Sequence, residues 1–278
     1  MQSFSSIAKR FGVSVTSIIR WFDKLNCPHP KLPECIAIDE FRGNAGGEKF
    51  QCNIADPLKH KVIDILPSRN TENLCKHFLE YPYKERAEVK KIIMDLSTLF
   101  RSVAKTMFPE AKIVADKFHV IRVVINSLEN VRKRIQKEFH ATKRKWFKRS
   151  RYLLLKPEYK LTSEDKIELA RMLNSSYDLE KAYVLKECFY EVFRKQTRTE
   201  AKKELGKWLL LAADLSLPEF QHCITTFSNW KTEIANIIGE RVSNGFIEGS
   251  NNKIKVLKRI SYGVRNFNRF RNRILYLE

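Results

Sequence analysis

Apolar residues in the first 25 positions recur every three or four residues, in two short blocks. One block covers residues 4–11 and the other residues 15–25, a spacing typical of two amphipathic helices. Gly12 lies between them and permits a tight turn, and Ser14 is a suitable N-cap for the second helix. The pattern predicts a helix-turn-helix, and a plain helical hairpin is the alternative.

The next segment, residues 26–34, holds three prolines that block regular structure, so we expect a domain boundary here. The pattern then changes to short β-rich runs at residues 35–41, 49–57 and 60–67, which are separated by glycines and by an Asp-Pro turn. Runs this short, joined by turn residues, predict a three-stranded antiparallel meander.

Helices and strands alternate in the stretch that follows. We expect helices at residues 70–80 and 97–108, and strands at residues 90–95 and 111–116. Alternation of this kind implies parallel pairing. Three strands followed by a β-α-β unit is the order of a ribonuclease H-like core, so the predicted fold class is α/β.

After Asp116 the strand pattern disappears and helical periodicity continues to about Ile238. The first long helix is expected to pack through Val120, Val124, Leu128, Val131, Ile135 and Phe139. Two later stripes are interpreted as helix-packing core, with Ala182, Leu185, Cys188, Phe189 and Val192 in one and Leu205, Trp208, Leu209 and Ala212 in the other. The expected organisation is a partial helix-turn-helix at 1–27, the first part of the core at 34–119, an all-helical basic insertion at 120–238, and a C-terminal part at 239–278 that completes the core.

Composition adds one strong signal, an excess of positive charge. Lysine and arginine number 52 against 32 acidic residues, a formal charge of +20 with an isoelectric point near 9.7. This imbalance indicates a polyanionic partner, nucleic acid before an acidic membrane. No apolar run approaches the roughly 18 residues that span a bilayer, and the N-terminus lacks a secretory signal. We therefore expect a cytoplasmic protein without a membrane partner.

Basic side chains gather in three regions where we expect contact with DNA. The second helix would present its exposed side to a major groove, and residues 131–156 are dense in lysine and arginine with aromatic residues between them. A solvated charged surface is the alternative for the latter region. The expected contacts are Val15, Thr16, Ser17 and Arg20, then Lys143, Arg144, Lys145 and Arg149, and finally Lys255, Lys258, Arg259 and Arg265.

The cysteines are scattered, without a CxxC pair or a nearby His-x-x-x-His partner. We expect reduced, mostly buried thiols and no structural zinc. The residues concerned are Cys27, Cys35, Cys52, Cys75, Cys188 and Cys223.

Two aspartates follow predicted strands that we expect to be neighbours. Asp39 comes late in the run CIAIDEF, and Asp95 ends the run KKIIMD. If the strands are adjacent, the carboxylates lie roughly 5 to 10 Å apart, at the strand ends where open α/β sheets keep their sites. Either aspartate alone could be a turn or helix cap. As a pair they are candidate ligands for the two divalent ions that metal-dependent phosphodiester cleavage requires.

A third carboxylate is expected from the helix that begins near Gly245. Its spacing places Glu248, Asn252, Lys255 and Arg259 along one side. The packing side is expected to hold Ile247, Ile254 and Leu257. A carboxylate directed at a metal beside basic residues directed at phosphate suits a helix that acts on DNA. The alternative is a surface glutamate paired with Asn252 or Lys255.

Asp116 and His119 lie at a predicted strand-to-helix corner. They could hold a flipped base or a scissile phosphate, and an N-cap aspartate with a satisfied histidine fits the pattern equally well. We treat them as accessory residues, together with Asn252, and outside the metal-binding set.

These segments together resemble the ISL3 family of bacterial insertion-sequence transposases, which belongs to the DDE superfamily. The resemblance runs from about residue 5 to the end, and is carried by IAIDEF, IIMDLS, IVADKFHVIRVVINSLENVRKRI and SNGFIEGSNNKIKVLKRISYGVRNFNRFRNRIL. It implies a ribonuclease H-like core with a helical insertion, the triad Asp39, Asp95 and Glu248, and two Mg²⁺ or Mn²⁺ ions. It further implies cleavage of DNA at element ends and strand transfer to target DNA. We expect a homodimer in the active complex, associated with the bacterial nucleoid.

The N-terminal region departs from the family pattern. Family members usually carry a cysteine-rich zinc-binding module and a complete helix-turn-helix before the catalytic domain, so we expect a truncated N-terminus. Two alternatives to an active transposase therefore remain. One is a catalytically silent, transposon-derived DNA-binding protein, and the other is a structure-selective nuclease of the same fold.

Overall fold

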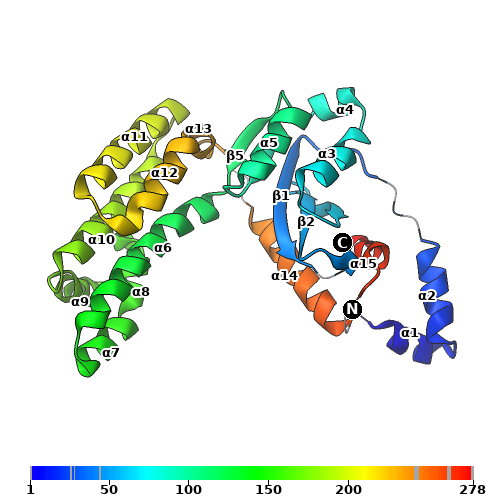
Figure 1. The fold of residues 1–278 in the computed structure, drawn as a ribbon, viewed down its shortest axis with the longest axis horizontal. Helices are drawn as coiled ribbons and strands as arrows, with labels where there is room; N and C mark the ends of the chain where they lie inside the picture. Colours follow the sequence, from blue (N-terminus) through cyan, green and yellow to red (C-terminus); the bar gives the residue numbers. More distant parts are fainter. Residues whose placement is uncertain are drawn as a thin grey trace. The chain divides into compact units, whose positions relative to one another are not determined.

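The computed structural model describes residues 2–25, 27, 29–43, 45–240, 244–261 and 264–276. The chain forms two compact units, shown in Figure 1. One, the sheet unit, comprises Met1–Val114 and Arg241–Glu278, and the other, the helical unit, comprises Ala115–Glu240. Among the described residues, no helix combines the length and the apolar character needed to cross a membrane.

A five-stranded sheet with the order β3-β2-β1-β4-β5 is the framework of the sheet unit. Its strands are β1 (Cys35–Arg42), β2 (Phe50–Asp56), β3 (Lys61–Leu66), β4 (Lys91–Met94) and β5 (Lys112–Ala115). The first three strands pair antiparallel in sequence order, as the meander predicted, and β1 pairs parallel with β4. The mixed sheet and its helices confirm the α/β class.

The helices of the sheet unit are α1 (Phe4–Phe11), α2 (Val15–Asp23), α3 (Thr71–Leu79), α4 (Tyr83–Ala87), α5 (Thr98–Met107), α14 (Gly245–Ile260) and α15 (Phe267–Leu275). A 3-10 turn, η1 (Ala45–Gly47), follows β1. The short helix α4 was not predicted from the sequence. Helix α14 packs against β1 and β2, and α15 packs against β3. Their buried side chains meet those of β1 and β3 in one core cluster, which includes Phe41, Ile65, Ile254, Leu257, Phe270 and Ile274.

The predicted helix pair at the N-terminus is confirmed. Gly12 ends α1 with a φ of 64°, the left-handed conformation that glycine adopts without strain. The hydroxyl of Ser14 accepts a hydrogen bond of 3.0 Å from the backbone nitrogen of Ser17, so Ser14 caps α2. Arg269 on α15 donates two hydrogen bonds to the carboxylate of Asp23, at 2.6 and 2.7 Å, and thereby holds α2 against α15.

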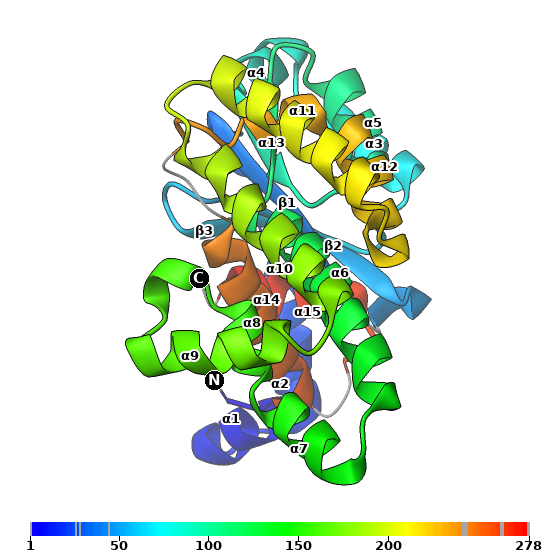
Figure 2. The same ribbon diagram turned by 90° about the vertical axis from the view of Figure 1, so that its left-hand side faces the viewer.

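The helical unit contains α6 (Lys117–Ile135), α7 (Ala141–Arg149), α8 (Arg151–Leu155), α9 (Ser163–Leu173), α10 (Tyr177–Tyr190), α11 (Arg198–Leu215), α12 (Gln221–Asn229) and α13 (Lys231–Ala235). Helix α6 runs beside α10 in both views (Figures 1 and 2). The extension of this first helix to Phe139 was wrong. It ends at Ile135 and passes into a 3-10 turn, and the ring of Phe139 lies 5.0 Å from that of Phe147.

Both later apolar stripes form core, as their spacing predicted. Every member is buried except Cys188 and Leu209, which are partly exposed. All six cysteines are free thiols, three of them buried and three partly exposed. Only Cys35, Cys52 and Cys223 are fully buried, so the expectation of mostly buried thiols holds for half of them, and their reduced state stays a prediction.

Candidate active site

Asp39 and Asp95 each follow the last registered pair of two neighbouring parallel strands. The β1–β4 register ends with Ile38 and Met94. Asp39 is the next residue within β1, three positions before that strand ends, whereas Asp95 is the first residue after β4. Adjacent strands are about 4.8 Å apart, and residues in register point to the same face of a sheet. Both aspartates are partly buried. The parallel pairing of β1 with β4 is consistent with the predicted proximity of these two carboxylates, which stays a prediction.

A side-chain network from α14 reaches the carboxylate of Asp39. The side-chain nitrogen of Asn251 donates to Asp39 Oδ2 at 2.8 Å, and the side-chain oxygen of Asn251 accepts from Asn53 Nδ2 at 2.9 Å. Asn53 lies opposite Asp39 in the β1–β2 register. It is fully buried, and Asn251 is nearly so. The two asparagines therefore set the orientation of the Asp39 carboxylate.

The other oxygen of Asp39 and one oxygen of Asp95 are held by the backbone. Asp39 Oδ1 accepts from the nitrogen of Glu40 at 2.8 Å, and Asp95 Oδ1 accepts from the nitrogen of Ser97 at 3.1 Å. Ser97 is the N-cap of α5. Asp95 thus shapes the turn between β4 and α5, a role that does not prevent its oxygens from contacting a cation.

Helix α14 presents two different sides, as its spacing predicted. Ile247, Ile254 and Leu257 are buried against the sheet. The predicted opposite side is exposed, and holds Glu248, Asn252, Lys255 and Arg259. Glu248 lies one turn before Asn251, so its backbone is close to the residue that contacts Asp39. Asn252 lies away from the sheet and accepts a hydrogen bond of 3.4 Å from Lys255.

Four carboxylates act on the buried thiol of Cys52 in β2. The pKa of the buried Cys52 thiol is raised well above its ordinary value, chiefly by burial and then by the charges of Asp39, Glu40, Asp95 and Asp64. However, the three predicted ligands do not form a tight cluster. Among the described residues, the only group of three or more potential ligands within 4.8 Å of one another lies elsewhere.

Asp116 and His119 form a local pair in the helical unit. Asp116 is the N-cap of α6 and accepts from the backbone nitrogen of Phe118 at 3.2 Å. Its second oxygen lies 2.6 Å from His119 Nδ1. Asp116 therefore caps the helix and pairs with His119, as one of the two alternatives predicted. Contact of these residues with DNA stays a prediction.

The residues predicted to contact DNA in α2 and α7 are mostly exposed. Thr16 and Arg20 are exposed, whereas Ser17 is partly buried and its hydroxyl lies 2.9 Å from that of Ser14. On α7, the exposed residues are Lys143, Arg144, Lys145 and Arg149. A hollow in the surface of the helical unit is lined largely by basic side chains, among them Lys133, Lys137, Arg144, Lys148 and Arg151.

Lys258 differs from the other basic residues predicted near the C-terminus. Its ammonium group donates to the backbone oxygens of Arg42 at 3.2 Å and Gly43 at 2.8 Å. Burial, followed by the charge of Arg42, lowers the pKa of Lys258. The residue thus anchors α14 to the end of β1. Lys255, Arg259 and Arg265 are exposed.

Comparison with known proteins identifies the family. A family model for ISL3-type DDE transposases, described as transposase, matches residues 36–274. The chain belongs to this family. The chain is 26% identical over 237 residues to the transposase for insertion sequence element IS1001 of Bordetella parapertussis. It is 25% identical over 254 residues to the transposase for insertion sequence element IS1557 of Mycobacterium tuberculosis.

The two alignments cover most of this chain but a smaller share of each relative. They include 84% and 83% of the ISL3 chain but 58% and 57% of the two relatives, so the chain spans a little over half of their length. A Lactococcus lactis protein named ATP-dependent protease is 34% identical over 116 residues, which cover 41% of the chain and 35% of that protein. So short an overlap carries no functional argument.

Two residues of the site were missed from the sequence alone. Asn251 and Asn53 contact each other and Asn251 contacts Asp39, but neither was singled out. A signal for Asn251 was present, because it falls between Ile247 and Ile254 on the packing side of the helix. A polar residue at such a position requires a buried partner.

Proposed function

We propose that this chain contains the catalytic domain of an insertion-sequence transposase, which cuts DNA at element ends and transfers the freed strand to target DNA. The observation that carries the proposal is the parallel pairing of β1 with β4, whose last registered pair immediately precedes Asp39 and Asp95, in a chain that belongs to the ISL3 transposase family. The strand order, with three antiparallel strands and a parallel β4, supports a ribonuclease H-like core. The proposed organisation is a core at 34–119 and 239–278, a helical insertion at 120–238, and a helix-turn-helix segment at 1–27.

The residues present fit a site for Mg²⁺ or Mn²⁺. Both ions prefer oxygen ligands, and Asp39, Asp95 and Glu248 would supply carboxylate oxygens. Asp39 and Asp95 both contribute to the raised pKa of the Cys52 thiol, so both carboxylates lie near the same buried group. When bound, two such ions would activate the attacking water or hydroxyl and stabilise the leaving oxygen.

The chain's own residues would orient the site and hold the DNA. Asn251 fixes the rotation of the Asp39 carboxylate through its hydrogen bond of 2.8 Å. The exposed Lys255 and Arg259 share a helix side with Glu248 and would bind phosphates next to the carboxylates. The basic residues of α7 would also bind DNA phosphates.

Asp116 and His119 would contact the scissile region of the DNA. A homodimer would hold the two element ends.

The test is replacement of Asp39 by Asn, which preserves shape and removes the charge. Wild-type protein should nick and join end-containing DNA in the presence of Mn²⁺, and Asp39→Asn should abolish both steps while DNA binding persists. Asp214→Asn, an exposed position on α11, serves as the matched control. Equal activity of Asp39→Asn and wild type would overturn the assignment.

Two other results would replace the proposal. Binding of end-containing DNA by the wild-type chain, without cleavage under any divalent metal, would indicate a silent DNA-binding protein. Cleavage of branched DNA without joining of 3′ ends would indicate a structure-selective nuclease.

A further inference from the structure

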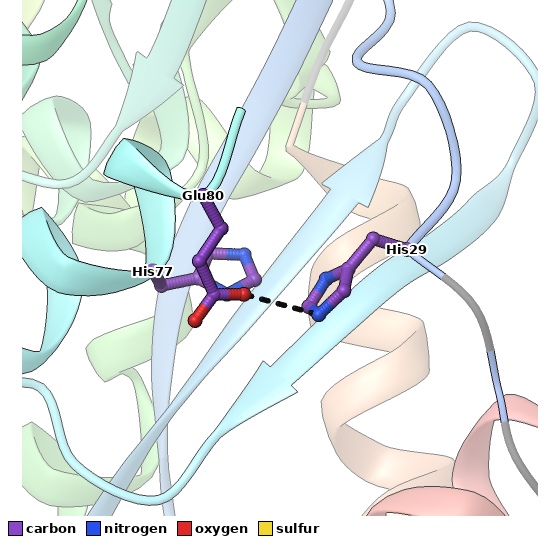
Figure 3. Close-up of side chains that lie close together, drawn as sticks. All are labelled: His29, His77 and Glu80. Atoms are coloured by element: carbon purple, nitrogen blue, oxygen red, sulfur yellow. Dashed lines mark ion pairs between the residues drawn. The ribbon is translucent and has the colours of Figure 1, made fainter. Parts of the chain in front are cut away.

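Two histidines and a glutamate converge between the linker and α3 in the sheet unit (Figure 3). His29 belongs to the linker that joins α2 to β1, His77 lies on α3, and Glu80 is the C-cap of α3. One potential ligand atom from each lies within 4.8 Å of the other two, and His29 Nε2 is 3.1 Å from Glu80 Oε2. In a tetrahedral site with bonds of about 2.0–2.1 Å, ligand atoms are roughly 3.3 Å apart. The distance between His29 and Glu80 is close to this value, and the other two distances do not exceed 4.8 Å.

One ring nitrogen of His77 lacks a hydrogen-bond partner among the described residues. The residue is 6% exposed, and its Nε2 is buried without a hydrogen-bond partner among the described residues. Native proteins seldom leave a buried ring nitrogen unsatisfied. A metal ion at Nε2 would satisfy this atom.

The buried carboxylate of Asp64 lies close to both imidazoles. Asp64 Oδ2 lies 3.6 Å from His29 Nδ1 and 3.8 Å from His77 Nδ1, and Asp64 is 1% exposed. Histidines that bind metals commonly direct their other ring nitrogen to a carboxylate, which fixes the tautomer and the ring orientation. Arg271 in turn donates to Asp64 Oδ2 at 3.0 Å. The Nδ1 atoms of both histidines therefore lie near Asp64.

We propose that His29, His77 and Glu80 bind a single Zn²⁺ ion, with solvent as the fourth ligand. Two imidazoles and one carboxylate form a donor set that zinc favours, whereas the oxygen-only set at Asp39 and Asp95 favours Mg²⁺ or Mn²⁺. The site uses histidine and glutamate and no cysteine, so it differs from the cysteine-based zinc sites that sequence spacing reveals. It is independent of the proposed catalytic metals.

We expect a bound ion to restrict the motion of the linker between α2 and β1. The linker is the direct covalent path from α2 to the sheet, and His29 lies in its middle. An ion shared by His29 and α3 would hold this path against the sheet unit and limit the motion of the α1–α2 pair. Tyr81 would help to enclose the site, because its ring packs edge-on against both imidazoles.

The experiment measures zinc retained by untagged protein after incubation with Zn²⁺ and gel filtration. All variants carry Asp39→Asn, so that the carboxylate pair contributes equally. The parent should retain one more equivalent of zinc than His29→Ala or Glu80→Gln, whose side chains are partly exposed and whose folding should be unaffected. His222→Ala, an exposed histidine on α12, should behave as the parent. Equal zinc content in the parent, His29→Ala and Glu80→Gln would overturn the proposal.

Two readouts separate a bound ion from surface adsorption. Zn²⁺ should raise the melting temperature of the parent and not that of His29→Ala, because only a ligand of the folded state stabilises it. Zn²⁺ should also slow tryptic cleavage after Lys31, an exposed linker residue, in the parent alone. An identical response of parent and His29→Ala in both assays would contradict a fastened linker.

Discussion

The side-chain nitrogen of Asn251 donates a hydrogen bond of 2.8 Å to the carboxylate of Asp39, across 212 positions of sequence. The amide cannot rotate freely, because its oxygen accepts from Asn53. Its nitrogen must therefore face Asp39. The contact joins α14 to β1 at the place where the proposed metal ligands lie.

We predict that Asn251→Ala lowers metal-dependent cleavage by about 10- to 100-fold, the usual cost of removing a partner of a metal ligand. The Asp39 carboxylate would lose its fixed orientation, so the metal concentration needed for half-maximal activity should rise. Nicking rates measured across a Mn²⁺ titration test this. Val256→Ala, an exposed change on the same helix, is the control. A metal dependence that Asn251→Ala leaves unchanged would argue against a positioning role.

The ion pair of Arg271 with Asp64 should contribute strongly to stability. Asp64 is 1% exposed, and Arg271→Met would leave its charge buried without a partner from α15. We expect a loss of about 3–5 kcal/mol in the free energy of unfolding. Urea denaturation in the presence of EDTA measures it. Arg269→Met, which removes the more exposed pair with Asp23, should cost only about 0.2–1 kcal/mol. Similar losses in the two variants would contradict this difference.

Lys258 and Lys255 lie on the same helix and should respond differently to replacement by Met. Lys258→Met removes two hydrogen bonds from a charged donor, and we expect it to cost about 1.5 kcal/mol of stability. Lys255 is exposed, so Lys255→Met should alter stability by less than about 0.5 kcal/mol. Chemical denaturation of both variants measures these changes in the free energy of unfolding. An equal loss in both variants would show that Lys258 does not anchor the helix.

The basic side of α7 should govern the salt dependence of DNA binding. Replacing Lys143, Arg144, Lys145 and Arg149 by Ala removes four exposed cations. The plot of log affinity against log salt concentration has a negative slope. Its magnitude should decrease by about 0.9 for each phosphate that the variant no longer binds. Titrations of DNA at several salt concentrations measure the slope. Lys203→Ala with Lys207→Ala on α11 is the comparison. An unchanged slope in the α7 variant would show that α7 is a solvated surface.

The contact between α2 and α15 should weaken in acid. A hydrogen bond from Arg269 lowers the pKa of Asp23 below its ordinary value of 3.8. A group with a lowered pKa in the folded state contributes stability above its unfolded pKa, and this contribution is lost as the pH falls through the folded value. Asp23→Asn should therefore be less stable than wild type by about 0.2–1 kcal/mol at pH 7 and equal to it below the folded pKa. A difference in stability that stays constant with pH would contradict this.

Local patterns were sufficient to predict the elements and the carboxylate pair. Alternation and helical spacing identified the strands and most helices, because burial of one side imposes a period on the sequence. The parallel β1–β4 pairing confirms that the two strands are neighbours, and this supports the prediction that Asp39 and Asp95 lie close together. Periodicity failed at Phe139, where the apolar spacing continues although the backbone leaves the helix.

By itself, the sequence determined the class of fold, the two sides of α14 and the residues available for chemistry, because each depends on interactions within one element or between successive elements. Only the tertiary structure decided which of these residues meet. Asn251 reaches Asp39, and His29 reaches His77 and Glu80, through the packing of segments that are far apart in sequence. A helical period shows which side of a helix is buried, but the partner on that side depends on how the elements pack together.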